Sequence, residues 1–134
     1  MASVQQVYER YHPSRLAPSA WQARSWLFMR ISGLGLVLLV LGHVAIMHVI
    51  SGGVDRIDFD FVAARWAGVF WRAYDFLILA LALTHGAIGA ATVIQDYVRP
   101  ARWRALLKTV LYSATFLFGS LGAFVIATFQ APGG

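Results

Sequence analysis

The sequence contains no cysteine and few charged residues. Without cysteine, the 134-residue chain has no thiol of its own for a disulfide, a thiolate metal site or an iron–sulfur cluster. Charged residues make up 13% of the chain, against the roughly 25% that is usual in soluble domains. Hydrophobic residues make up 59%. This composition is too apolar for a water-soluble domain and predicts a membrane protein.

Three long stretches lack Asp, Glu, Lys and Arg, and they lie at 31–54, 76–95 and 109–134. Each reaches the ~20 residues needed to cross a hydrocarbon layer of ~30 Å. We therefore predict an all-α membrane protein with three transmembrane helices in a single membrane-anchor domain, 1–134. The predicted elements are an N-terminal polar segment at 1–26, spans at 27–50, 73–95 and 105–129, and a short interfacial amphipathic helix at 58–70.

The chain has a net charge of +5, and its basic residues lie beside the apolar stretches. This distribution favours a membrane surface over nucleic acid as the partner. Cytoplasmic loops of membrane proteins collect Lys and Arg. Basic residues outnumber acidic ones before the first span and between the second and third spans, whereas the connection at 51–72 is balanced. The sequence therefore predicts a multi-pass protein with a cytoplasmic N-terminus and an outside C-terminus.

His85 lies deep in the second apolar stretch. Ionisable side chains at membrane depth are costly and usually serve a function, and neutral imidazole is an axial ligand of haem iron. Asp96 follows eleven residues later, which places it on nearly the same helix face and about 16 Å further along the axis. Gly89, one turn from His85, would leave room for a flat macrocycle. The alternative is a histidine hydrogen-bonded to a neighbouring helix.

Asp96 and Tyr97 end the second span on the predicted inner side. A quinone needs hydrogen-bond donors for its carbonyl oxygens and a source of protons, and a tyrosine combines an apolar ring with a polar tip. Asp96 would relay a proton or hold an arginine. The alternative is that the pair anchors the helix end at the interface, with Tyr97 in the aromatic belt.

The first span carries Arg30, His43 and His48. Arg30, at the inner edge, is a candidate partner for haem propionates or a quinone oxygen, or a snorkelling cation. His43, about 20 Å from Arg30 and so expected level with His85, is a candidate ligand of a second haem, or a hydrogen-bonding group within the bundle. His48, near the outer surface, is another candidate for a second haem, or a hydrated interfacial residue.

The segment from His85 to Pro100 resembles the hydrophobic D-type membrane-anchor subunit of succinate dehydrogenase (respiratory complex II). In that family a histidine of the second helix is an axial ligand of haem b, and an Asp-Tyr pair eleven and twelve residues later lies at the quinone site. His85, Asp96 and Tyr97 match this pattern without a gap. The run Arg30-Ile31-Ser32-Gly33 resembles the Arg-x-Ser-Gly start of the first helix, and 59–66 looks like bacterial members.

The resemblance implies a part in an enzyme complex rather than an enzyme by itself. The chain would be a non-catalytic anchor in a two-subunit helix bundle in the inner membrane of a bacterium. Its partners would be a second anchor subunit (C type), an iron–sulfur subunit and a flavoprotein that oxidises succinate, together with membrane lipid. Its cofactors would be haem b and a quinone, either ubiquinone or menaquinone.

Two other functions remain open from the sequence. The first is the anchor of a quinol:fumarate reductase, in which similar parts run in reverse. The second is a structural membrane scaffold without a cofactor. An absorption spectrum separates the scaffold from both anchors, because haem b absorbs visible light.

Overall fold

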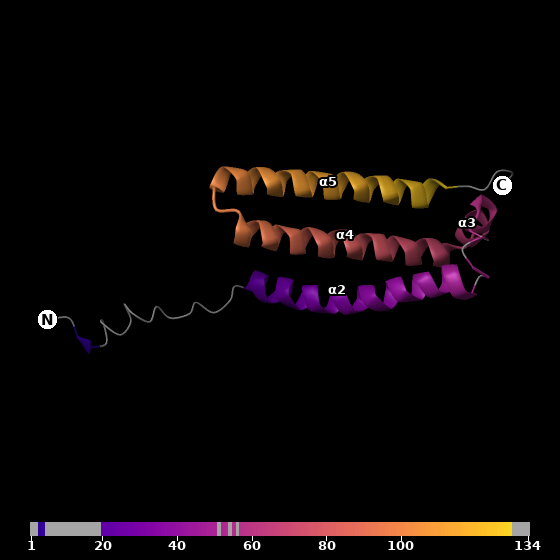
Figure 1. Cartoon of the computed structure of the whole chain (residues 1–134), viewed down its shortest axis with the longest axis horizontal. Helices are drawn as coiled ribbons and strands as arrows, with labels where there is room; N and C mark the ends of the chain where they lie inside the picture. Colours follow the sequence, from indigo (N-terminus) through magenta and orange to yellow (C-terminus); the bar gives the residue numbers. More distant parts are fainter. Residues whose placement is uncertain (1–2, 5–19, 51, 54, 56, 130–134) are drawn as a thin grey trace.

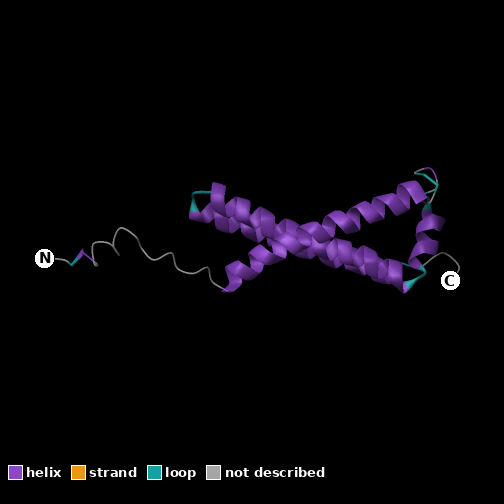
Figure 2. Cartoon of the chain, turned by 90° about the horizontal axis from the view of Figure 1, so that it is seen from below, coloured by secondary structure: helices purple, strands orange, loops and turns teal. Residues whose placement is uncertain are grey.

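The computed structural model describes residues 3–4, 20–50, 52–53, 55 and 57–129. Its long helices are α2 (Ala20–Val44), which continues as the π-helical turn η1 (Ala45–Ile50), α4 (Val69–Tyr97) and α5 (Ala101–Thr128). A short helix, α3 (Phe59–Trp66), lies between the first two. Figure 1 shows α4 between α2 and α5, and Figure 2 shows α2 crossing the other two at an angle. The predicted all-α fold with three long apolar helices is confirmed.

The long helices pack side by side but bury few side chains. In the part of the chain that the structure describes, the buried apolar residues are Ala63, Ala87 and Ala91, while large apolar side chains are exposed along all three long helices. Each long helix has the length and composition needed to span a membrane. These side chains therefore contact hydrocarbon or a partner in the membrane instead of a protein core, as in a multi-pass membrane protein.

The helices extend beyond the predicted spans. α2 begins at Ala20 rather than at 27, α4 at Val69 rather than at 73, and α5 at Ala101 rather than at 105. A charge-free stretch marks the hydrocarbon layer, whereas a helix ends only where its backbone hydrogen bonds end. Each helix therefore starts before its charge-free stretch, in a segment that includes arginine. Of the predicted segment 1–26, residues 1–2 and 5–19 lie outside the described residues.

The interfacial helix is shorter than the predicted 58–70. Asp58 caps its start, because the carboxylate accepts a hydrogen bond of 2.8 Å from the backbone N–H of Phe61. The helix ends at Trp66, and Gly68 has an extended backbone that turns the chain into α4. Amphipathic spacing continues across this turn, so the pattern alone does not reveal the break.

Asp75 joins three helices at the predicted outer end. Its carboxylate accepts a hydrogen bond of 2.7 Å from Nε1 of Trp66 and a longer one of 3.5 Å from Nη2 of Arg65. Nδ1 of His43, in α2, lies 3.3 Å from the same carboxylate. The Arg65 guanidinium is buried and lies 3.9 Å from the centre of the Trp71 ring. Asp75 therefore holds α3 against α4 and α2.

Arg72 ties the C-terminal end of α5 to this corner. Its guanidinium donates hydrogen bonds to the carbonyl oxygens of Ala127, at 3.3 Å, and Phe129, at 2.7 Å, and also to that of Trp66. The Trp66 and Phe129 rings meet edge to face, with centroids 5.1 Å apart. The last carbonyls of a helix have no partner within the helix, and a cation there is favourable.

Small residues let α4 and α5 approach closely. A Cβ at Gly122 would lie 2.6 Å from a methyl carbon of Leu79, and one at Gly119 would lie 3.4 Å from Leu83. At the end where α4 meets α5 in sequence, Nζ of Lys108 donates a hydrogen bond of 2.6 Å to the side-chain oxygen of Gln95.

Candidate functional site

His85 contacts α2 through a single hydrogen bond. Its Nδ1 lies 2.8 Å from the hydroxyl oxygen of Ser32. Ser32 is 2% exposed, less than any other described residue. The structure therefore places the imidazole between two apolar helices and near the middle of α4, which is 29 residues and about 43 Å long.

The hydrogen bond to a neighbouring helix is what the alternative interpretation of His85 predicts. It occupies only one of the two ring nitrogens, however. An imidazole that binds iron through Nε2 usually donates its Nδ1 proton to an oxygen beside it. The observed geometry of His85 therefore fits both a structural histidine and an axial ligand, and Ser32 supplies the oxygen that the ligand role needs.

The glycine that makes room for the His85 ring is Gly33. A Cβ at Gly33 would lie 3.3 Å from Cε1 of His85. The predicted gap at Gly89 is less open, since a Cβ there would meet the methyl carbon of Met29 at 3.5 Å. A Cβ at Gly86 would meet no described atom within 4 Å. The α4 surface one residue beyond His85 is thus open to a planar group or a partner helix.

The expectation that His43 lies level with His85 is wrong. Ser32 marks the level of His85 on α2, and His43 is eleven residues further on, about 16 Å along the axis. Its neighbour across the helices is Asp75. The imidazoles of His43 and His85 therefore do not face one iron atom. His48 is exposed in the η1 turn.

Arg30 lies in the N-terminal half of α2, and its guanidinium stacks 3.7 Å from the centre of the Trp26 ring. The neighbouring cavity has a volume of about 490 Å³ and opens between α2 and α4. Its lining combines aromatic, hydroxyl and amide side chains with glycine, and comprises Trp21, Gln22, Ser25, Trp26, Met29, Arg30, Ile88, Gly89 and Thr92. This amphipathic lining would accept an apolar ring with polar oxygens.

Asp96 and Tyr97 form the last turn of α4 and face outward. Tyr97 is 81% exposed, and Asp96 is exposed as well. The lining of the cavity beside Arg30 includes neither of them. The structure therefore places the phenol and the carboxylate together at one helix end, but not in the cavity that Arg30 lines. A surface contributed by another chain would be needed to enclose them.

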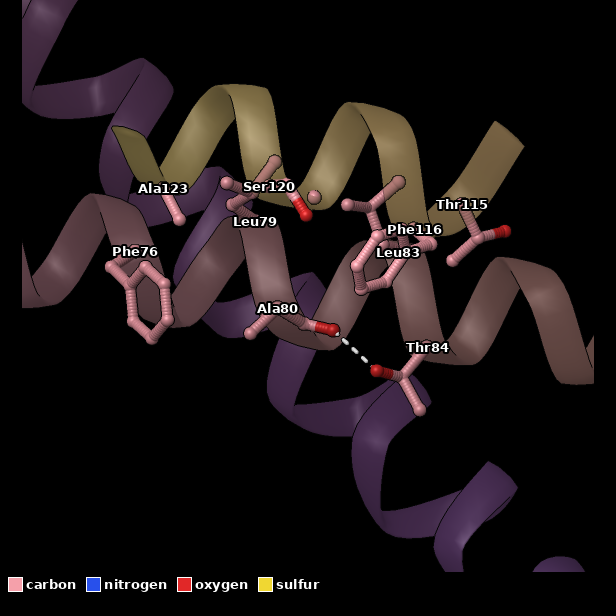
Figure 3. Close-up of a pocket in the computed structure, with 10 residues that line it drawn as sticks. Phe76, Leu79, Ala80, Leu83, Thr84, Thr115, Phe116, Ser120 and Ala123 are labelled. Atoms are coloured by element: carbon pink, nitrogen blue, oxygen red, sulfur yellow. Dashed lines mark hydrogen bonds between the residues drawn. The ribbon is translucent and has the colours of Figure 1, made fainter. Parts of the chain in front are cut away.

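A second cavity, of about 350 Å³, lies between α4 and α5 (Figure 3). Leu79, Leu83 and Phe116 form much of its wall. The hydroxyl of Thr84 donates a hydrogen bond of 2.7 Å to the carbonyl oxygen of Ala80 in its own helix. The hydroxyl of Thr115 likewise donates to a carbonyl oxygen of its own helix, so the lining is mainly apolar, with the Ser120 hydroxyl as a further polar group.

Sequence reasoning missed several contacts that shape the site. It includes Ser32 only in the run that resembles the start of the first helix, and it assigns no role to Asp75. Tyr74 donates a hydrogen bond of 2.6 Å to the carbonyl oxygen of Leu39 in α2. Tyr74 precedes His85 by eleven residues, as Asp96 follows it by eleven. Residues at this interval share a helix face. The spacing of Tyr74 and His85 could therefore have predicted which face of α4 contacts α2.

Within the described ranges, no group of three His, Cys, Asp or Glu side chains could hold a metal ion. Axial ligation of haem needs only one imidazole from a chain. Together, the three spanning helices and the imidazole held between two of them define a polytopic membrane subunit with a candidate cofactor ligand at mid-membrane depth.

The model of the succinate dehydrogenase/fumarate reductase transmembrane subunit family matches residues 9–127, and the chain belongs to this family. A search among curated proteins gives no match. The protein is thus a transmembrane anchor subunit of a succinate dehydrogenase or fumarate reductase complex.

Proposed function

We propose that the chain is the D-type anchor of a succinate:quinone oxidoreductase. It docks the iron–sulfur and flavoprotein subunits at the membrane and contributes to a haem b site and a quinone site. The observation that carries this proposal is the His85 imidazole, held by Ser32 at mid-membrane depth on the helix that ends in Asp96 and Tyr97.

The residues present fit a haem. His85 would be one axial ligand through Nε2, because Nδ1 is engaged by Ser32. The open surface at Gly86 leaves space beside the ligand. A second anchor subunit, of the C type, would supply the other axial ligand. Arg30, a cation near the inner end of α2, would pair with propionates or with a quinone oxygen. Haem b supplies a one-electron carrier within the membrane.

Tyr97 and Asp96 fit the proposed quinone site through their chemistry and position. The exposed phenol of Tyr97 would donate a hydrogen bond to a quinone carbonyl oxygen, and Asp96 would hold or relay a proton beside it. Their place at the end of a spanning helix puts both groups at the boundary between hydrocarbon and water. His43 and His48 remain candidates for a second haem or for its surroundings.

The charge distribution supports the orientation. The turn between α4 and α5 and the start of α5 carry Arg99, Arg102, Arg104 and Lys108 against Asp96 alone. These cations favour the cytoplasmic side of a bacterial inner membrane. The soluble subunits would then dock on the side where Asp96 and Tyr97 lie, while α3 and the C-terminus lie outside.

The test is a reduced-minus-oxidised absorption spectrum of the complex purified through this chain. We expect a haem b signal in the wild type and its loss or alteration in His85→Ala, with the subunits still assembled. Thr84→Ala is the matched control, because the Thr84 hydroxyl bonds only its own helix. A wild-type complex without haem would favour a cofactor-free scaffold, and an unchanged spectrum in His85→Ala would refute the ligand role. The favoured direction of turnover distinguishes succinate oxidation from fumarate reduction.

A further inference from the structure

The contact between Ser32 and His85 does more than join two helices. A hydroxyl buried in an apolar environment needs a hydrogen-bond partner, and many serines in membrane helices find one in their own backbone. Here the Ser32 hydroxyl oxygen lies 2.8 Å from the imidazole of another helix, 53 residues away in the sequence. The position of the ring is therefore set from α2, although the ring belongs to α4.

This hydrogen bond involves Nδ1 in either of the two tautomers of a neutral imidazole. If the hydroxyl of Ser32 donates to Nδ1, then Nε2 carries the proton and has no lone pair for a metal. If Nδ1 carries the proton and donates to the Ser32 oxygen, the Nε2 lone pair is free. A serine hydroxyl can accept as well as donate, so Ser32 can serve as the acceptor in the second state, which is the state that iron ligation through Nε2 requires.

Gly33, next to Ser32 in α2, leaves the space that the His85 imidazole ring occupies. The distance of 3.3 Å between a Cβ built there and Cε1 of His85 is tighter than an ordinary carbon contact. Any side chain at Gly33 would therefore push the ring along or away from α2. By contrast, a Cβ at Gly35, in the same helix, would meet no described atom within 4 Å.

We infer that Ser32 and Gly33 are positioning residues that fix the orientation and the donor strength of the His85 imidazole, and so lower the reduction potential of the haem it holds. The inference rests on the proposed function, in which His85 ligates haem. A hydrogen bond from Nδ1–H to an oxygen makes Nε2 more basic, which stabilises the ferric state relative to the ferrous state. Loss of the acceptor reverses this effect.

The experiment uses the purified complex and measures three quantities: haem content, the electron paramagnetic resonance spectrum of the ferric haem, and its reduction potential. In Ser32→Ala we expect the haem to remain and the potential to rise. A neutral hydrogen bond contributes about 0.5–1.5 kcal/mol, so the ferric-to-ferrous ratio at a given potential should fall about two- to tenfold. At about 59 mV per tenfold for one electron, this is a rise of about 20–60 mV.

Two further variants separate positioning from general damage. Ser32→Cys keeps the volume and a weak acceptor, so its potential should lie between those of the wild type and Ser32→Ala. Gly33→Ala should alter the ferric spectrum, because it displaces the ring, whereas Gly35→Ala should not. If Ser32→Ala loses haem, retention of haem in Ser32→Cys and Gly35→Ala supports the inference, and loss in all three contradicts it.

The inference fails by itself if His85→Ala removes the haem signal but Ser32→Ala keeps both the wild-type potential and the wild-type spectrum. The proposed function fails as well if His85→Ala keeps an unaltered haem. The two failures are thus distinguishable in one set of purified complexes.

Discussion

Replacing Asp75 with asparagine should release the interfacial helix from the bundle. Asp75→Asn retains one side-chain oxygen but removes the negative charge that faces Arg65 and His43. Arg65 is 8% exposed, and its guanidinium would then be buried without a counter-charge. Breaking a buried ion pair by removing one partner costs about 3–5 kcal/mol. Asp75 retains some solvent contact, so we expect the lower end, about 3 kcal/mol.

Amide hydrogen exchange of α3 in the membrane-embedded protein measures this effect, because it reports the free energy of local opening. A loss of about 3 kcal/mol corresponds to exchange about a hundredfold faster, at roughly 1.4 kcal/mol per factor of ten. The amides in the middle of α4 should keep their protection. This difference separates local release of α3 from general unfolding.

Asp60→Asn is the matched control, since Asp60 is an exposed acid in the first turn of the same helix. It should change the opening free energy by at most about 1 kcal/mol, through the helix dipole. In the double variant Arg65→Leu/Asp75→Leu no buried charge remains, so part of the loss should be recovered. Exchange in Asp75→Asn no faster than in Asp60→Asn would refute the reasoning.

The remaining predictions concern the inner helix end and the helix contacts. Tyr97→Phe should lower the rate of quinone reduction by about tenfold, because it removes one donated hydrogen bond. Succinate oxidation with a soluble artificial acceptor should stay at the wild-type rate. Tyr112→Phe serves as the control, and equal losses in both assays would mean that Tyr97 has only a structural role. Gly122→Ala should destabilise the contact of α4 and α5 by about 1 kcal/mol or more in a denaturing-detergent titration, because its methyl would overlap Leu79. Gly119→Ala should cost less, since its methyl would make an ordinary contact, and the reverse order would contradict this packing.

Hydropathy is sufficient to predict the architecture. The charge-free stretches predict three spanning helices, and amphipathic spacing predicts the short helix between the first two. The ends of the helices are harder to predict. The helices that begin at Ala20 and Val69 start before their charge-free stretches, because a change in composition does not end backbone hydrogen bonding. The turn at Gly68 is hidden for a similar reason, since apolar spacing continues across it.

For the candidate site, the order along one helix can be predicted from the sequence, but the pairing between helices cannot. The eleven-residue interval puts His85 and Asp96 on one side of α4. It does not reveal that Ser32, rather than His43, lies opposite His85. That match depends on the register of α2 against α4. In this register a Cβ at Gly42 would lie 2.9 Å from the Tyr74 hydroxyl oxygen, and one at Gly33 would lie 3.3 Å from Cε1 of His85.

Residue types and their spacing along the chain thus specify three membrane-crossing helices, a histidine far from either end, and a phenol and carboxylate at one terminus. These properties are local, since each depends only on helical geometry and on the transfer of side chains into hydrocarbon. Packing between helices decides which oxygen meets Nδ1 of His85, which carboxylate meets His43, and how α3 is held. Such contacts join residues tens of positions apart through distances of a few ångströms, and small changes in helix register would exchange one partner for another.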